Sequence, residues 1–377
     1  MIDLEPLYQQ VQLHFQETEI DRIEALVLTS FGLDVSYLEK AILPSFFPKL
    51  GDGPASEPHR PLFEHLEETN LPISVLFDAD ELVRGDRPAS ATRSVIKELR
   101  WQAHPVRSQS GCFHPKLIVA LVRGENDQRG LVVGSTSTNL TQSGWGRNLE
   151  ACALNTVWLQ KGIQDSLLVD LQELLTDLQK FAAESESLHL IQDAIAEAQP
   201  RAFTRRCHGF NYRTRLWHAA KGVSLDRFLA TEVLHRDLAD AGQGWRLEVL
   251  SPYYSEQPPQ LIAWAQRQLM RNRDDHESPV ILCCCPRDEG KFDIDPAVAQ
   301  AFMEAGNLAW AELPSAFTKS RLKDVEGNAL TRFLHAKIYR FWCPEAEVLV
   351  VGSANATTQG CRDGGQGNDE ACLIFSR

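Results

Sequence analysis

The stretch FHPKLIVALV (113–122) returns in diverged form as FLHAKIYRFW (333–342), once an offset of one residue is allowed for. Both copies contain His-x-Lys followed by apolar residues of the kind that form buried strands. Alternate residues of a strand face the same side, so each copy presents an imidazole and an ammonium group together. One His-x-Lys pair carries little information, but two copies in register point to a duplicated chain.

The similarity extends on both sides of these stretches. The matched histidines are 221 residues apart, the matched Gly-Ser serines 218 and the matched glutamates 220. The other matching segments are GLVVGSTSTNLTQSG (130–144) with VLVVGSANATTQG (348–360), RNLEACAL (147–154) with GNDEACLI (367–374), ALVLTSFGLDVSYLEKAIL (25–43) with LEVLSPYYSEQPPQLIAWA (247–265), and PISVLFDADEL (72–82) with PVILCCCPRDE (279–289).

Each half therefore predicts strand–helix–strand–helix–strand, followed by three strands that carry the motifs. Alternating strands and helices are typical of an α/β sheet that is covered on both faces. We expect an α/β fold with two mixed-sheet halves packed as a pseudo-dimer and a helical insertion between them. The predicted division is 1–158 for the first half, 159–243 for the connector and 244–377 for the second half.

The connector contains two different kinds of sequence. Residues 159–199 have leucines at helical spacing and predict one or two helices. Residues 201–217 (RAFTRRCHGFNYRTRLW) interleave arginines with aromatic residues. This pattern fits a track for single-stranded nucleic acid, with Arg205, Arg206 and Arg213 on the phosphates. It fits equally well a solvated connector whose aromatic side chains pack on the core.

Composition excludes several classes of protein. The 377 residues carry 38 Lys+Arg against 51 Asp+Glu, a net charge of −13, and 43% are hydrophobic. These are globular proportions, and no apolar run approaches the ~18 residues of a membrane span. The nine cysteines form no CxxC pair, so neither a disulfide framework nor a zinc site is predicted. We expect a cytoplasmic protein with no metal and no cofactor.

The repeated motifs supply groups that can bind a phosphate. Each half offers a histidine, a lysine, an amide donor and a carboxylate, so two halves together make a symmetric cage for one phosphate. The serines of the Gly-Ser steps, Ser135 and Ser353, either contact phosphate or shape the turn. The candidate catalytic residues are His114, Lys116, Asn139, Glu150, His335, Lys337, Asn355 and Glu370.

This pattern resembles the phospholipase D superfamily, whose members place two His-x-Lys motifs around one active site. The commonest superfamily pattern adds an aspartate five residues after the lysine, where this chain has Leu121 and Trp342. In lacking that aspartate the chain is similar to the branch of tyrosyl-DNA phosphodiesterases and nucleases. Some prokaryotic relatives of this kind act in phage-defence or restriction systems.

The resemblance implies metal-independent hydrolysis of nucleic-acid phosphodiesters, by a nuclease or an end-processing enzyme. His114 would attack phosphorus and form a phosphohistidine, while His335 would serve as general acid and base. The lysines and asparagines would bind the phosphate oxygens, and the glutamates would fix the histidine tautomers. DNA is favoured over RNA as the substrate. The acidic net charge suggests loading by a partner, such as a helicase or another subunit of a defence complex.

The sequence is also compatible with two other functions. The first is a phospholipase or phosphatidyltransferase that acts on lipids, which the missing aspartate and the lack of a basic amphipathic helix disfavour. The second is a subunit that binds nucleic acid within a complex without cleaving it.

Overall fold

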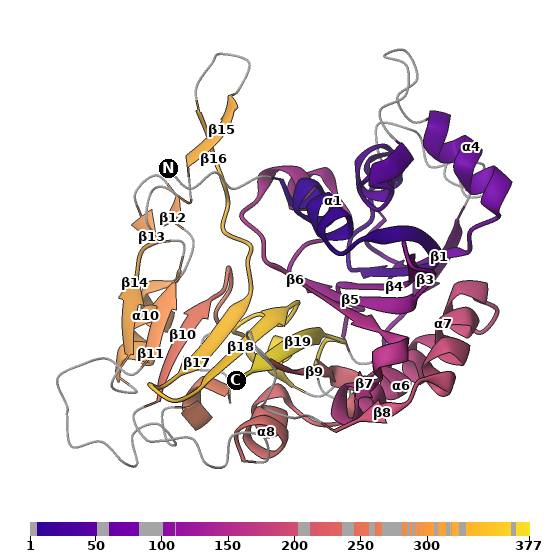
Figure 1. The fold of residues 1–377 in the computed structure, drawn as a ribbon. Helices are drawn as coiled ribbons and strands as arrows, with labels where there is room; N and C mark the ends of the chain where they lie inside the picture. The colour runs from indigo at the N-terminus through magenta and orange to yellow at the C-terminus, as the bar shows by residue number, and fades with distance from the viewer. Residues whose placement is uncertain are drawn as a thin grey trace.

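The first half of the chain forms a six-stranded mixed sheet (Figure 1). The three strands at one side of this sheet run parallel to one another, and β4, β5 and β6 continue it in antiparallel steps. In spatial order the strands are β3 (Gln102–Val106), β2 (Ile73–Asp78), β1 (Ile20–Ser30), β4 (Leu117–Gly124), β5 (Arg129–Thr136) and β6 (Cys152–Trp158).

The second half repeats this sheet with the same order and directions and adds one strand. The additional strand, β9, comes from the predicted connector and pairs with β19 at the sheet edge. In spatial order the strands are β14 (Leu308–Ala311), β11 (Ile281–Cys284), β10 (Arg246–Leu250), β17 (Ile338–Trp342), β18 (Glu347–Gly352), β19 (Ala371–Ser376) and β9 (Arg213–His218). The predicted α/β class with two mixed-sheet halves is confirmed.

The structure is a computed structural model that describes most, but not all, of the chain. The described residues are 6–50, 60–82, 101–109, 111–202, 212–235, 245–255, 261–265, 281–284, 287–288, 291–292, 294–304, 308–313, 317, 319–323, 329–362 and 367–377.

Helices connect and cover the sheets. The longer ones are α1 (Leu7–Glu17), α4 (Arg60–Thr69), α6 (Asp165–Gln179), α7 (Glu186–Glu197) and α10 (Pro296–Glu304). The short helical segments are α2 (Val35–Tyr37), η1 (Leu38–Ile42), α3 (Leu43–Ser45), η2 (Pro48–Leu50), η4 (Ser143–Arg147), η5 (Leu159–Lys161), η6 (Ala219–Lys221), α8 (Leu225–Phe228), η7 (Leu229–Leu234) and α12 (Thr358–Cys361). Two-stranded pairs are formed by β7 (Ile163–Gln164) with β8 (Pro200–Arg201), β12 (Arg287–Asp288) with β13 (Lys291–Phe292), and β15 (Lys319–Lys323) with β16 (Ala329–Thr331).

The connector helices pack between the two halves. Helix α6 turns leucines at helical spacing toward the core, as its sequence predicts, and contacts β9 of the second sheet. Helix α7 contacts β1, β2 and β4 of the first sheet. One apolar cluster joins Val27 and Val133 of the first sheet with Leu216 and Leu373 of the second. The segment predicted as an insertion therefore stabilises the position of one half against the other.

Within the described part of the chain, no helix combines the length and apolar character required to cross a bilayer.

Candidate active site

Two short backbone bridges bring the motifs of the two halves together. Phe113 pairs with Asp369, and Leu149 pairs with Leu334. In the first bridge the His114 amide donates to the Asp369 carbonyl at 2.9 Å. In the second bridge the amide of His335 makes the equivalent bond to the Leu149 carbonyl, also at 2.9 Å. Each His-x-Lys segment is therefore fixed to the Asn-x-Glu segment of the opposite half.

The histidine–glutamate pairs cross between the halves for the same reason. His114 Nδ1 lies 2.8 Å from Glu370 Oε2, and His335 Nδ1 lies 2.8 Å from Glu150 Oε1. The glutamate side chains are at most 2% exposed. An imidazole that donates from Nδ1 to a carboxylate keeps its Nε2 for chemistry. The sequence predicts that the glutamates orient histidines, and the structure shows that each histidine is oriented by the other half.

Ser137 is a site residue that the sequence analysis missed. The β5–β6 ladder pairs Thr136 with Cys152, and the β18–β19 ladder pairs Gly352 with Cys372. Ser137 is therefore the structural counterpart of Ser353, and the predicted match of Ser135 with Ser353 is wrong by two residues. Aligning the repeats on Ser-x-Asn instead of Gly-Ser gives the correct match.

These equivalent serines hold the two carboxylates in place. Ser137 Oγ donates to Glu150 Oε2 at 2.5 Å, and the Ser353 side chain hydrogen-bonds Glu370. An asparagine two residues before each glutamate also donates, Asn148 to Glu150 and Asn368 to Glu370. A carboxylate with this many donors has one orientation, which is what a tautomer-fixing group requires.

The Ser135 hydroxyl donates to the backbone carbonyl of Ala371 at 3.3 Å, and Ser353 Oγ lies at the same distance from that carbonyl. Both residues are completely buried. Of the two roles predicted for these serines, this geometry fits the shaping of the turn and leaves no surface for a phosphate contact.

The two lysines are buried beside the histidines. Lys116 and Lys337 are each 1% exposed. Lys116 Nζ donates to the His114 carbonyl at 3.0 Å, and Lys337 Nζ donates to the His335 carbonyl at 2.8 Å. Lys337 also donates to the carbonyl of Ser137, in the other half, at 3.3 Å. Backbone carbonyls satisfy these ammonium groups only in part, so each can still donate to an anion.

Burial sets the protonation of the site. It lowers the pKa of Lys116 to about 7 and that of Lys337 to about 8, against the opposing effect of the nearby carboxylates. Burial also raises the pKa of Glu370 to about 8. Burial opposes the ionisation of Glu150, but His335 and Lys337 outweigh it and lower the pKa of that carboxyl.

The pKa values of the two histidines are also shifted to different extents. Burial, helped by the charge of Lys116, lowers the pKa of His114 well below its usual range. Burial lowers the pKa of His335 as well, but the hydrogen bond that its Nδ1 donates to Glu150 opposes this effect. Of the two rings, His335 is therefore the one whose protonated form has the better support.

These pKa shifts predict a catalytic rate that falls with rising pH. Both lysines must be protonated to bind a phosphate oxygen, and they lose their protons between about pH 7 and 8 in the unliganded site. We expect kcat/KM for phosphodiester cleavage to decrease through this range, and the kcat limb to lie at higher pH because a bound anion favours protonated lysine. Steady-state rates from pH 5.5 to 9.5, with circular dichroism at each pH as the folding control, measure both limbs. A kcat/KM that rises between pH 7 and 9 would contradict this assignment.

Asn139 and Asn355 begin equivalent loops that follow the serines. The amide oxygen of each is buried and has no hydrogen-bond partner among the described residues. Gly144 and Gly360 lie against these loops, where an added Cβ would come within 2.6 Å of the Asn139 carbonyl and 2.8 Å of the Asn355 backbone. The two glycines therefore permit the close approach that positions the asparagine loops.

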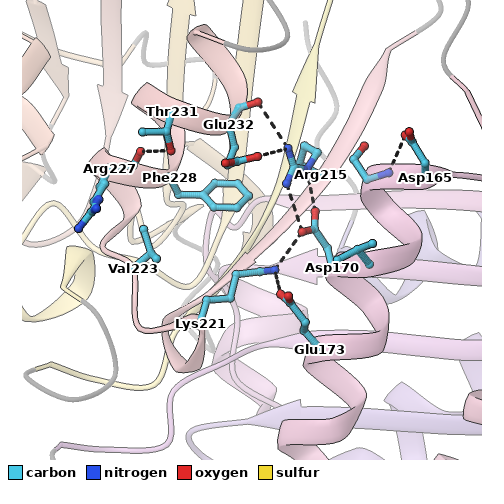
Figure 2. A pocket seen from close by; sticks show the side chains of 12 residues that line it. Asp165, Asp170, Glu173, Arg215, Lys221, Val223, Arg227, Phe228, Thr231 and Glu232 are labelled. Carbon is cyan, nitrogen blue, oxygen red and sulfur yellow. Dashed lines mark hydrogen bonds and ion pairs between the residues drawn. The ribbon is translucent and has the colours of Figure 1, made fainter.

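Of the predicted arginine track, the described residue Arg213 does not join this cluster. Arg213 pairs with Ser376, whereas His218, at the other end of β9, pairs with Ala371 beside Glu370. The strand places Arg213 roughly 16 Å along the sheet from that end, at ~3.3 Å per residue. Arg205 and Arg206 lie outside the described residues. Arg215, from the same segment, is buried in an ion-pair cluster with Asp170 that lines a separate cavity of about 690 Å³ (Figure 2).

No group of three or more His, Cys, Asp or Glu in the described ranges is arranged to hold a metal ion.

Solved structures with the same fold include a DNA-processing enzyme. Yeast tyrosyl-DNA phosphodiesterase is 12% identical, with 93% of this chain and 82% of that chain covered and a TM-score of 0.51. A mutant of the yeast enzyme is 13% identical, with coverage of 99% and 87% and a TM-score of 0.53. Phosphatidylserine synthase from Haemophilus influenzae Rd KW20 is 9% identical, with coverage of 98% and 80% and a TM-score of 0.47. No protein-family model and no curated protein sequence matches the chain.

Proposed function

We propose that this chain, which has the duplicated phospholipase D fold, is a metal-independent phosphodiesterase that cleaves nucleic acid through a phosphohistidine intermediate. One observation carries the proposal: two histidines, each held at Nδ1 by a buried glutamate of the opposite half, lie in one cluster with two buried lysines. This arrangement supplies a nucleophile, a general acid and two cations around one point.

In the proposed first step, the Nε2 lone pair of His114 attacks phosphorus and an N–P bond forms. The bond from phosphorus to the leaving oxygen breaks, and that oxygen takes the Nε2 proton of His335. In the second step His335 removes a proton from water, whose oxygen attacks phosphorus. The N–P bond breaks and His114 is regenerated. The pKa difference between the two histidines supports this division, because His114 favours the neutral form.

Lys116 and Lys337 would neutralise the non-bridging oxygens in both steps. A divalent metal often supplies this charge in other phosphodiesterases, and here two ammonium groups take its place. Asn139 and Asn355 would donate their amide N–H groups to the same oxygens. Glu370 and Glu150 would keep the proton of each imidazole on Nδ1 whenever Nε2 is the reacting nitrogen.

A nucleic-acid substrate, with DNA before RNA, is supported by two facts. The chain lacks the motif aspartate, as Leu121 and Trp342 occupy its positions, and the yeast enzyme that shares the fold is named for a DNA adduct. The net charge of −13 opposes binding to a polyanion. We therefore propose that a partner, such as a helicase or another subunit of a cytoplasmic phage-defence complex, delivers the substrate.

The test uses labelled single- and double-stranded DNA and RNA, and in parallel phosphatidylcholine–phosphatidylglycerol vesicles, all in excess EDTA. We expect cleavage of nucleic acid at a rate that EDTA leaves unchanged, and no release of lipid head groups. Head-group release without nucleic-acid cleavage would replace the proposal with a lipid enzyme. Salt-dependent DNA binding without turnover of any substrate would indicate a binding subunit.

A further inference from the structure

Two exposed aromatic side chains lie near the His335 imidazole. Among the described residues only five large apolar side chains are exposed, and two of them are Tyr253, at 51%, and Phe333, at 39%. The ring centroid of each lies 6.4 Å from the centroid of the His335 imidazole. Two exposed aromatic rings beside one candidate catalytic group offer contact surface to a ligand at that place.

Hydrogen bonds hold the backbone at both residues. The Phe333 carbonyl accepts from the Leu149 amide at 2.9 Å, in the bridge that joins the two halves. The Tyr253 carbonyl accepts from Ser251 Oγ at 2.8 Å, and the same hydroxyl accepts from the amide of Ala356. The backbone from which each ring projects is therefore held in place near His335.

The first half has a different ring at its histidine, because the half-buried Phe31 lies 5.1 Å from the His114 imidazole, centroid to centroid. Ser30 makes the same two hydrogen bonds as Ser251, to the Gly32 carbonyl and from the Leu140 amide, so Gly32 is the counterpart of Tyr253. Cys112 precedes His114 by two residues and is the counterpart of Phe333. The exposed rings therefore lie at His335, whereas the ring beside His114 is the half-buried Phe31.

We propose that Tyr253 and Phe333 form a stacking clamp for an unpaired nucleobase on the leaving-group side of the scissile phosphate. This inference rests on the proposed function, in which His335 protonates the leaving oxygen. Stacking requires a free base face, which a duplex hides between neighbouring base pairs and a single strand exposes. The clamp makes the enzyme selective for single strands and gives the strand one direction through a symmetric catalytic centre.

The two flat rings are better suited to bind a nucleobase than a lipid chain. A lipid chain needs a continuous apolar surface, and here the exposed apolar groups at the site are two separate rings. The rings are set at 81° and 35° to the imidazole, so they offer faces of different orientation beside the same phosphate position. A base next to the leaving oxygen can lie on one face and meet the second ring at its edge.

The experiment uses a short DNA strand with one cleavable phosphodiester, the other linkages being methylphosphonates. Three versions of this strand are compared. The first has a base at every position, the second has an abasic residue on the leaving side of the phosphodiester, and the third has an abasic residue on the other side. The enzymes are the wild type, Tyr253→Ala, Phe333→Ala and the double variant. Val169→Ala, which truncates a 51% exposed apolar residue on α6, is the matched control. Tyr253→Phe, which keeps the ring, is the rescue variant.

We expect each alanine variant to lose kcat/KM by roughly 5- to 150-fold on the strand with all its bases, mainly through KM. Removing the base on the leaving side is expected to lower kcat/KM of the wild type by a similar factor. The same removal should lower kcat/KM of the alanine variants little further. Removing the base on the other side should leave the effect of the variants intact. Tyr253→Phe and Val169→Ala should behave as the wild type.

If the alanine variants lost kcat/KM equally on all three strands, or lost none, the clamp would be overturned and the nuclease proposal would remain intact. If the wild type cleaves none of the strands, the nuclease proposal fails separately. The clamp is then decided by fluorescence anisotropy on the same strands. Tighter binding of the strand with bases than of the leaving-side abasic strand, lost in the double variant, supports it, and equal binding overturns it.

Discussion

Replacing either His114 or His335 by alanine is expected to reduce turnover of a nucleic-acid phosphodiester by roughly 10⁴-fold or more. The first variant removes the proposed nucleophile, and the second removes the proton donor for the leaving oxygen. Residues that act as one unit do not contribute additively, so the double variant should be little slower than either single one. Cleavage rates in excess EDTA measure all three.

The two variants should differ in what they accumulate. His335→Ala lacks the base that activates water, so a slow first step should leave an acid-labile protein–DNA adduct on His114. His114→Ala should give no adduct. His189→Ala, a change at an exposed position on α7, is the control and should retain full activity. An adduct found only in the His114 variant would reverse the two roles, and full activity in both variants would refute the proposed centre.

The second large effect concerns stability and lies outside the active site. Asp170, on α6, is 1% exposed and accepts two hydrogen bonds from Arg215, at 2.8 and 3.3 Å, and one from Lys221 at 2.9 Å (Figure 2). It also accepts from the Leu216 amide at 3.0 Å. Asp170→Ala would remove the closer of two carboxylates from Arg215, itself 5% exposed, and leave that of Glu232 at 3.4 Å. We expect a loss of about 3–5 kcal/mol in the free energy of unfolding.

Chemical denaturation of matched variants separates this effect from a general loss of charge. Glu173 binds the same lysine but its side chain is 52% exposed, so Glu173→Ala should change the stability by less than about 1 kcal/mol. The double variant Asp170→Leu with Arg215→Met removes both charges and should recover most of the lost stability. A destabilisation by Asp170→Ala no larger than that of Glu173→Ala would show that the cluster does not hold α6 against β9.

The sequence predicted the fold class and proposed the residues of the candidate site. Because a duplication leaves two copies of every motif, comparing the halves gave six strands in each half and the eight candidate residues, but it left β9 in the connector. It misplaced one pairing, that of Ser135 with Ser353, because the Gly-Ser step is more conspicuous than the Ser-x-Asn that the strand register aligns. It also grouped Arg215 with a possible nucleic-acid track, although this side chain is buried against α6.

Other features depend on how the halves meet. Two equivalent sets of motifs cannot indicate whether the glutamate that hydrogen-bonds a histidine comes from the same half or from the opposite half. The local sequence is the same in both cases. The bridges at Phe113 and Leu149 decide it, because they align each His-x-Lys segment with the opposite Asn-x-Glu segment. The sequence also did not predict that Tyr253 and Phe333 lie together near His335. The two residues are 80 positions apart, and the local sequence around each is ordinary. Repetition within the chain determined which groups take part, and packing of the two halves determined which of them face one another.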